Sequence, residues 1–334
     1  MKSYLFFVLR RLAQLIAVIF AGVTAAFLIS HLSPISPVES IIGRVSAQSS
    51  YSPQAVESLR QTLTELFGLD VPLHEQYFNF LGRLVVGDLG PSLIAFPTPA
   101  MHLVSLALPW TVGLMVAQIV IAWFIGNVFG GLAGYYQNSK PLKAVGVVAI
   151  AIQPIPYYIV AFLMVIVFGF LWPVLPISGG FAMNVRPGFT PEFIGSVLRH
   201  AILPVSALVI SGIGTWFLGM RALVSNIVTE DYVTYAELAG VDQRRIVSSY
   251  VIRNAMVPQL TALAMALGLI FSGTIITEQV FSYPGLGSLL VRAVNGGDSA
   301  VVLAVSCVAV IAVATAIFII DMIHPLLDPR VKAE

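Results

Sequence analysis

The side chains able to do chemistry are few and scattered in this sequence of 334 residues. It has 5 histidines and 1 cysteine, and it contains neither an H-E-x-x-H zinc motif nor a G-x-S-x-G nucleophile elbow. The lysines (Lys2, Lys140, Lys143 and Lys332) do not lie in a G-x-x-x-x-G-K-[ST] phosphate-binding loop. We therefore expect no catalytic, cofactor-binding or metal-binding residues in this chain.

One polar segment carries a pattern that suits the docking of another protein. A helix over residues 231–239 would place small and aromatic side chains on one face, at i, i+3, i+4 and i+7: Tyr232, Tyr235, Ala236 and Ala239. Gly240 would end this helix because glycine permits a tight backbone turn, and Pro258 would close the helical stretch that follows. An exposed face of this kind fits the groove of a partner protein.

The composition predicts that these elements belong to a membrane protein. Hydrophobic residues make up 58% of the chain and charged residues 10%, and the mean hydropathy is +0.92. A soluble domain carries about 25% charged residues, so we expect a lipid bilayer to cover much of this surface. The net charge of +1 offers no concentrated basic patch for nucleic acid.

Charge-free runs predict six membrane-spanning helices, since about 20 apolar residues cross a hydrocarbon core about 30 Å thick. The expected spans are roughly Leu12–Leu32, Leu106–Tyr135, Ala144–Leu171, Ala201–Met220, Pro258–Thr277 and Ser299–Ile320. Arg10 and Arg11 precede the first span, as in a signal peptide. The apolar run exceeds the ~7–15 residues of a cleavable signal, so we expect a retained anchor.

The distribution of basic residues predicts the orientation, because lysine and arginine stay cytoplasmic during insertion. With the N-terminus inside, the cytoplasmic segments hold 11 of the 17 basic residues, and both termini are cytoplasmic. The expected regions are the N-terminus with the first span (1–32), an extracytoplasmic segment (33–102), a transmembrane core (103–322) with a cytoplasmic loop (221–257), and a cytoplasmic tail (323–334).

The extracytoplasmic segment contains a predicted amphipathic helix. Ser52 is placed as the N-cap, Pro53 as the first helical residue and Gly68 as the stop. Apolar residues recur between them at helical spacing: Val56, Leu59, Leu63, Leu66 and Phe67. This helix would lie on the membrane surface or pack on the spans, either as a structural cap or as a contact for an external partner.

The interiors of the predicted spans hold no ionisable residue, and Glu278 and Asp321 lie only at span edges. An ion-coupled carrier would be expected to keep such residues inside the membrane. The intramembrane amides and hydroxyls are expected mostly to bond between helices: Gln118, Asn127, Gln153, Thr215, Ser272 and Thr274. The energy source for transport would therefore be another protein, and an ion-driven secondary carrier is the less favoured alternative.

The loop at Gly240 also carries a family resemblance. DYVTYAELAG (231–240), followed by RRI and RNAMVP, resembles the cytoplasmic EAA loop of binding-protein-dependent ABC importer permeases. More narrowly, the chain is similar to the B-type permease subunit of oligopeptide, dipeptide and nickel importers. Three more stretches agree in order along the chain: GLDVPLHEQYFNFLGRLVVGDLGPS (68–92), GTIITEQVFSYPGLGSLL (273–290) and DMIHPLLDPRV (321–331).

The resemblance implies an all-α permease of the type I ABC importer kind, in a bacterial or archaeal cytoplasmic (inner) membrane. It implies a heterodimer with a second, homologous permease subunit, two ATP-binding subunits that bind ATP and magnesium, and an extracytoplasmic substrate-binding protein. The implied cargo is a peptide, and an oligosaccharide or a nickel complex is the alternative.

The resemblance also implies which residues act. The ATPase-coupling loop would comprise Asp231, Tyr232, Thr234, Tyr235, Ala236, Glu237, Ala239, Gly240, Arg244 and Arg245. Ala236 and Ala239 would permit close approach to the ATPase, whereas Glu237 and Ala239 replace two basic residues usual in the subfamily, so the charge pairing should differ. A candidate outer gate, or else a simple structural turn, comprises Tyr283, Pro284, Gly285 and Gly287.

Overall fold

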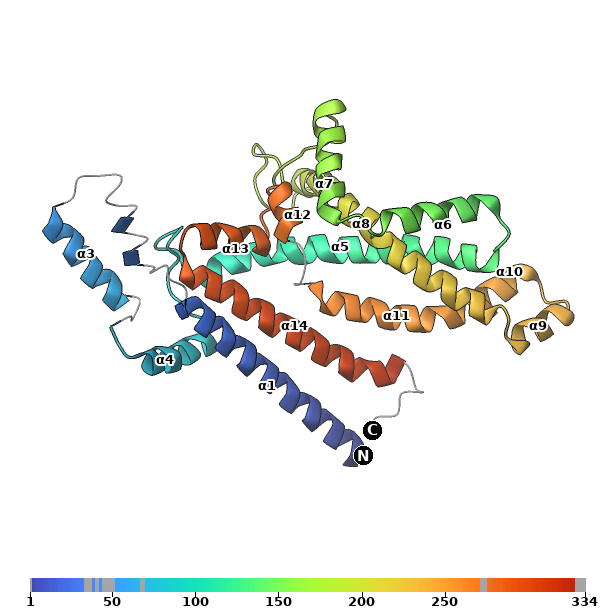
Figure 1. The fold of residues 1–334 in the computed structure, drawn as a ribbon, viewed down its shortest axis with the longest axis horizontal. Helices are drawn as coiled ribbons and strands as arrows, with labels where there is room; N and C mark the ends of the chain where they lie inside the picture. Colours follow the sequence, from blue (N-terminus) through green and yellow to red (C-terminus); the bar gives the residue numbers. More distant parts are fainter. Residues whose placement is uncertain are drawn as a thin grey trace. The chain divides into compact units, whose positions relative to one another are not determined.

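The structure is a computed structural model that describes residues 2–32, 38–39, 42–43, 52–66, 70–270 and 275–327. The described residues form helices and no strand, apart from an isolated bridge between Pro91 and Pro99 (Figure 1). Three predicted features lie outside them: the end of the amphipathic helix at Phe67 and Gly68, the hydroxyls of Ser272 and Thr274, and the end of the tail (328–334).

The helices follow one another along the whole described chain. Their bounds are α1 (Lys2–Leu32), α3 (Pro53–Leu66), α4 (Leu73–Val85), α5 (Ala100–Tyr135), α6 (Lys140–Ile152), α7 (Tyr157–Val165), the π-helix η1 (Ile166–Leu171), α8 (Pro191–Ile227), α9 (Asp231–Leu238), α10 (Gln243–Arg245), the π-helix η2 (Ile246–Ile252), α11 (Arg253–Gly268), α12 (Ile275–Val280), α13 (Leu286–Asn295) and α14 (Ser299–Leu327).

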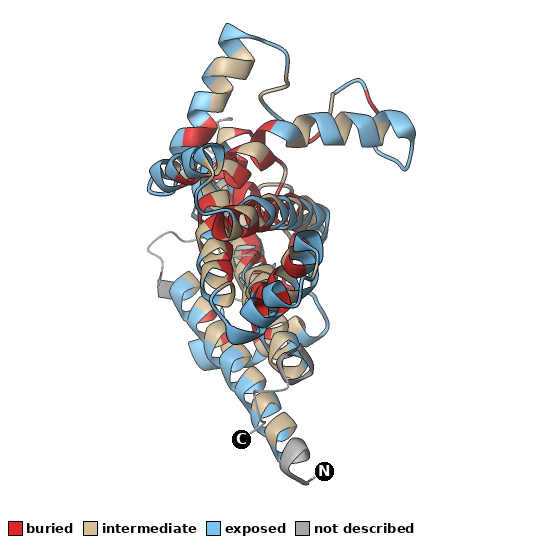
Figure 2. Cartoon of the chain, turned by 90° about the vertical axis from the view of Figure 1, so that its right-hand side faces the viewer, coloured by how far each residue is buried: buried red, intermediate tan, exposed pale blue. Residues whose placement is uncertain are grey.

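Four of these helices are long and apolar enough to cross a membrane: Phe6–His31, Ala100–Tyr135, Pro191–Ile227 and Ser299–Ile323. They contain four of the six predicted spans. Large parts of the long helices are exposed (Figure 2), as expected where lipid covers their outer faces. The all-helical membrane fold is confirmed at this level.

The third predicted span, 144–171, is not one straight helix. It consists of α6 and the α7–η1 helix, which are bent by 101° at a short break, so the pair is a broken span or a re-entrant loop. Pro154 and Pro156 lie at the break, and Pro156 is the N-cap of α7. Proline removes a helical hydrogen bond and keeps the preceding residue out of the helical conformation, which explains the bend.

The fifth predicted span also has different limits. Its helix, α11, has 16 residues and ends at Gly268, before the expected end at residue 277. Pro258 lies inside α11 and does not close the preceding stretch, contrary to prediction. Membrane helices tolerate an internal proline because neighbouring groups satisfy the freed carbonyl.

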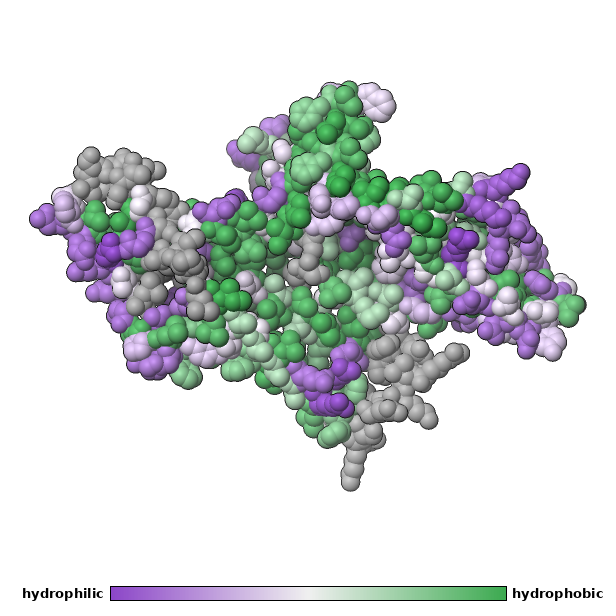
Figure 3. Space-filling view, viewed as in Figure 1, coloured by the Kyte–Doolittle hydropathy of each residue, from purple (hydrophilic) through white to green (hydrophobic). Residues whose placement is uncertain are grey.

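The chain divides into two compact units, and each is described by itself. The first comprises residues 1–11, 112–283 and 316–334, and the second comprises residues 12–111 and 284–315. In the first unit α8 packs against α6, α7 and α11. Figure 3 shows apolar surface over α5 and α6, and polar surface over α9 and α10.

A row of glycines joins α5 to α8 within the first unit. Gly126, Gly130 and Gly134 lie on one face of α5, at i, i+4 and i+8. A Cβ at Gly130 would lie 2.4 Å from the Phe217 carbonyl oxygen, and one at Gly134 would lie 2.7 Å from Val224 Cβ. The two backbones therefore touch, which only small residues permit in membrane helix packing.

The second unit contains the predicted amphipathic helix as α3. It begins at Pro53, and the Ala55 backbone N–H donates to Ser52 Oγ over 3.3 Å, so the predicted start is confirmed. Val56 and Leu59 pack against Val38 and Ile42. Part of the apolar face of α3 thus covers a neighbouring segment of the same unit.

Candidate ATPase-coupling surface

The predicted coupling loop is a folded extension of α8. A turn over residues 228–230 links α8 to α9, and residues 239–242 link α9 to α10, which continues through η2 into α11. The Asp242 carboxylate caps α10 by accepting a hydrogen bond from the Arg244 backbone N–H over 3.0 Å. Arg244 and Arg245 both lie exposed on this short helix.

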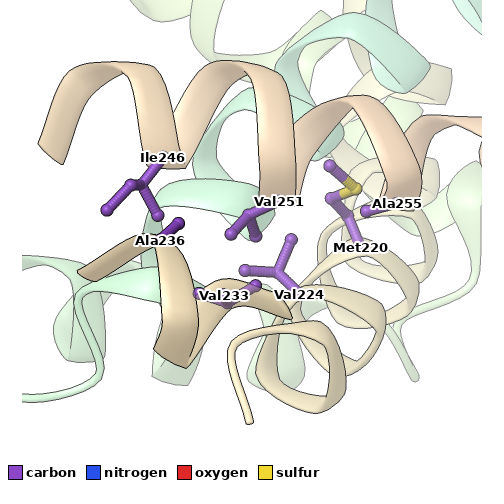
Figure 4. Close-up of a cluster of buried hydrophobic side chains, with 7 residues drawn as sticks. All are labelled: Met220, Val224, Val233, Ala236, Ile246, Val251 and Ala255. Atoms are coloured by element: carbon purple, nitrogen blue, oxygen red, sulfur yellow. The ribbon is translucent and has the colours of Figure 1, made fainter. Parts of the chain in front are cut away.

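A buried apolar cluster attaches α9 to the membrane helices. Its members come from α8, α9, η2 and α11 (Figure 4): Met220, Val224, Val233, Ala236, Ile246, Val251 and Ala255. In addition to the cluster, Asn254 Nδ2 donates a hydrogen bond of 3.1 Å to the Tyr232 hydroxyl. Because one core contains side chains from all four elements, α9 is held against the ends of α8 and α11.

The outward face of α9 differs in one residue from the predicted face. Ala236 is 7% exposed and lies in the cluster, so it cannot provide close approach to a partner. Tyr235 and Leu238, by contrast, are 70% and 80% exposed. Val233 and Ala236 face inward because they pack on α8 and η2. Helical spacing within such a short segment does not determine which side of the helix faces inward.

The other predicted loop residues lie where a partner could reach them. Exposed side chains surround Tyr235 and Leu238: Asp231, Tyr232, Thr234, Glu237 and Ala239. Asp231 and Glu237 place negative charge on this surface. Leu238, which lay outside the predicted set, is its most exposed apolar member.

Gly240 makes the turn that the sequence predicts. Its φ is +73°, in the left-handed region that favours glycine. The Gly240 N–H donates to the Glu237 carbonyl over 3.0 Å, and the Val241 N–H donates to the Ala236 carbonyl over 3.1 Å. This pair of bonds is the Schellman arrangement that ends helices at a left-handed residue.

The candidate gate residues occupy a buried turn between two short helices. In the first unit, the Tyr283 backbone N–H donates to the Glu278 carbonyl over 2.7 Å. Burial, and to a smaller extent the charge of Glu278, raises the pKa of Tyr283 to about 12, so its hydroxyl stays protonated.

The second segment of the second unit begins at Pro284, and Gly285 is the N-cap of α13. The Leu286 N–H donates to Thr111 Oγ1 over 2.8 Å, and Gly287 is buried. A gate function for these residues stays a prediction.

The second unit contains a buried carboxylate that the sequence analysis did not single out. Asp298 is fully buried, and its Oδ2 accepts hydrogen bonds from Ser92 Oγ (2.6 Å), the Leu93 N–H (2.7 Å) and the Ile94 N–H (3.0 Å). Its Oδ1 accepts from the Val301 N–H over 3.1 Å and so caps α14. An aspartate after two glycines and before an apolar run is a recognisable helix start, but its three partners at 92–94 are distant in sequence.

A second carboxylate in the same unit is solvent-exposed. The Gly90 N–H donates to Asp88 Oδ1 over 3.0 Å, and Arg83 Nη2 lies 3.3 Å from the same oxygen. The hydrogen bond from Gly90 and the charge of Arg83 hold the pKa of Asp88 below its usual value.

Comparison with known proteins identifies the family of the chain. The family model described as binding-protein-dependent transport system inner membrane component matches residues 126–333, which include α9 and Gly240. The chain is 28% identical to a di/tripeptide transport system permease protein of Pseudomonas aeruginosa, covering 98% of each chain. It is 25% identical to an oligopeptide transport system permease protein of Bacillus subtilis, covering 98% of this chain and 99% of the relative.

A third relative is a glutathione transport system permease protein of Escherichia coli, 27% identical over 98% of each chain. All three similarities extend over nearly the full length of both proteins. The family model alone covers more than half of the chain. The chain therefore belongs to the family of binding-protein-dependent transport system inner membrane components.

Proposed function

We propose that this chain is the permease subunit of an ATP-driven ABC importer and forms half of the translocation pathway for a peptide-type substrate. The family and the names of the three relatives support this class of transporter. The observation that carries the proposal is α9, which exposes Tyr235 and Leu238 on one side and is anchored by Val233 and Ala236 on the other.

This arrangement suits the transfer of motion from an ATPase to the membrane helices. An ATPase groove that holds the exposed side of α9 would move it as a rigid element. The cluster would pass that movement to the ends of α8 and α11, because interdigitated apolar cores do not deform gradually. ATP and magnesium would bind to the two partner ATPases, and this chain would supply no residue to the ATP or magnesium sites.

The rest of the proposed assembly follows from the same class. A second, homologous permease would form a heterodimer with this chain, and a binding protein would deliver the substrate from outside. The chain would cross a bacterial or archaeal inner membrane six times with both termini cytoplasmic. The α6–α7 pair would form the third crossing, and α11 would lie in the fifth.

Removing the exposed apolar groups of α9 is expected to uncouple transport. The double substitution Tyr235→Ser with Leu238→Ser should reduce ATP-driven uptake by about tenfold or more, since loss of one interface hot spot costs about 2 kcal/mol. The measurement is uptake and substrate-stimulated ATP hydrolysis by the assembled complex in proteoliposomes. Tyr235→Phe with Leu238→Met, which keeps apolar side chains at both positions, is the matched control, and unchanged uptake in the serine double variant would contradict the proposal.

Substitution of Gly240 tests the orientation of α9. A Cβ at Gly240 would meet no atom within 4 Å, so Gly240→Val strains only the backbone at φ +73°. We expect a cost of about 1–3 kcal/mol and a misplaced α9, with reduced uptake. Gly240→Asn should retain most activity because asparagine tolerates the left-handed conformation. Equal uptake by the valine variant and the wild type would mean that this turn does not position the coupling surface.

A further inference from the structure

Helix α4 in the second unit has a broader apolar face than its neighbour covers. At about 100° per residue, its apolar side chains form one arc, which also contains His74 in the first turn: Leu73, Tyr77, Phe78, Phe80, Leu81, Leu84 and Val85. Its polar side chains Glu75, Asn79 and Arg83 lie at i, i+4 and i+8 on another side. The helix is therefore amphipathic along its whole length.

One part of the apolar arc packs on the C-terminal part of α1. The rings of Tyr77 and Phe80 each lie 5.2 Å from the ring of Phe27, centroid to centroid. The Tyr77 hydroxyl lies 2.6 Å from Thr24 Oγ1, and Gln76 Oε1 lies 3.1 Å from His31 Nε2. These contacts fix α4 beside residues 24–31 of α1.

Within the part of the chain that the structure describes, the other part of the arc is largely uncovered. Phe78 is 67% exposed and Val85 is 88% exposed, and the half-buried Leu81 lies between them. The three residues lie at i, i+3 and i+7 and so form one stripe along the helix. We call Phe78, Leu81 and Val85 the free stripe.

The contacts with α1 also indicate how deep α4 lies in the membrane. The apolar span of α1 ends at His31, and Thr24 lies seven residues before it, or about 10 Å along a helix that rises about 1.5 Å per residue. Interfacial helices bury their apolar face about 5–10 Å into the boundary between headgroups and acyl chains. The position of α4 on α1 matches this depth.

The surface of helix α1 beside α4 is also largely exposed. Only 11% of its span is buried within the chain, the lowest share among the four candidate spans. Its side chains Leu28 and Ile29, from the stretch that α4 lies beside, are 43% and 71% exposed. Lipid is therefore the medium expected next to α4.

We propose that α4 lies in the membrane–water interface, with the free stripe in contact with lipid acyl chains. Glu75, Asn79 and Arg83 then face the headgroups and water, while Tyr77 and Phe80 fasten the helix to α1. The helix has three sides for three different neighbours: α1, lipid and water. This inference goes beyond the proposed function, since lipid contact at α4 does not depend on the substrate or on the ATPases.

Spin labels on α4 test the inference in the complete complex reconstituted in phospholipid nanodiscs. Single cysteines are introduced in a Cys307→Ala background as Phe78→Cys and Val85→Cys on the free stripe, and as Glu75→Cys and Asn79→Cys on the polar side. Collision with oxygen, which concentrates in lipid, is compared with collision with a water-soluble nickel chelate. We expect the oxygen-to-nickel collision ratio to exceed one at 78 and 85 and to fall below one at 75 and 79.

Two other results would overturn the inference. Labels at 78 and 85 that collide with the nickel chelate as often as those at 75 and 79 would place the free stripe in water. Labels that collide with neither reagent would mean that a protein subunit covers the stripe. All four positions are exposed, so the labels should not disturb folding, and the readout does not require transport.

Discussion

Replacing Asp298 with alanine is expected to lower the free energy of unfolding by about 3–5 kcal/mol, because it removes the acceptor of several buried hydrogen bonds. The carboxylate accepts four hydrogen bonds, three of them from residues 92–94 and one from Val301 at the start of α14. Each buried donor left without an acceptor costs about 1–3 kcal/mol. The loop at 92–94 and the N-terminus of α14 should therefore separate.

Denaturant unfolding of the purified chain in detergent measures the loss of stability. Two further variants serve as comparisons. Asp298→Asn retains one acceptor oxygen and should lose less stability than alanine. Asp88→Asn removes an exposed carboxylate from the same unit and should cost under about 1 kcal/mol, as exposed ion pairs do. If Asp298→Ala were as stable as Asp88→Asn, the hydrogen bonds to Asp298 would not hold this unit together.

The glycine row on α5 should be intolerant of a single added methyl group. We expect Gly130→Ala to lose about 1–3 kcal/mol of stability, as overpacked cores do, and to reduce uptake. Its Cβ would lie 2.4 Å from the Phe217 carbonyl oxygen and 3.0 Å from Phe217 Cα. Both are backbone atoms that cannot rotate away, so α5 and α8 would have to move apart.

Gly113→Ala is the matched control on the same helix. A Cβ at Gly113 meets no atom within 4 Å, so the same methyl group should be neutral or add up to about 1 kcal/mol through helix propensity. Only the Gly130→Ala variant should thus lower the unfolding midpoint. A Gly130→Ala protein that unfolds like Gly113→Ala would show that α5 and α8 do not pack in backbone contact.

Much of the membrane architecture could be predicted from the sequence. Four expected spans fall within helices long and apolar enough to cross the bilayer, because hydropathy and length are local properties. The start of α3 at Pro53 and the turn at Gly240 were also predictable, since capping and left-handed turns depend on single residues. The spacing of Gly126, Gly130 and Gly134 would have indicated close helix packing.

Other features could not be predicted from local pattern. The two prolines of the third span account for a break in its helix, but they do not by themselves specify the angle of 101° between α6 and α7. The direction of Ala236 depended on α8 and η2, which take up one side of α9. The four partners of Asp298 come from two segments about 200 positions apart in sequence, so no spacing rule could bring them together.

The sequence by itself determined that lipid surrounds this protein, where most of its helices lie and where the chain turns at Gly240. Those properties follow from hydropathy, charge and single-residue conformational preferences, all of which act over short stretches of chain. Only the tertiary structure decided which side of α9 is free, which glycines allow α5 to touch α8, and which donors surround Asp298. Each of these depends on close packing between distant segments, and packing is a property of the pair of surfaces and not of either one alone.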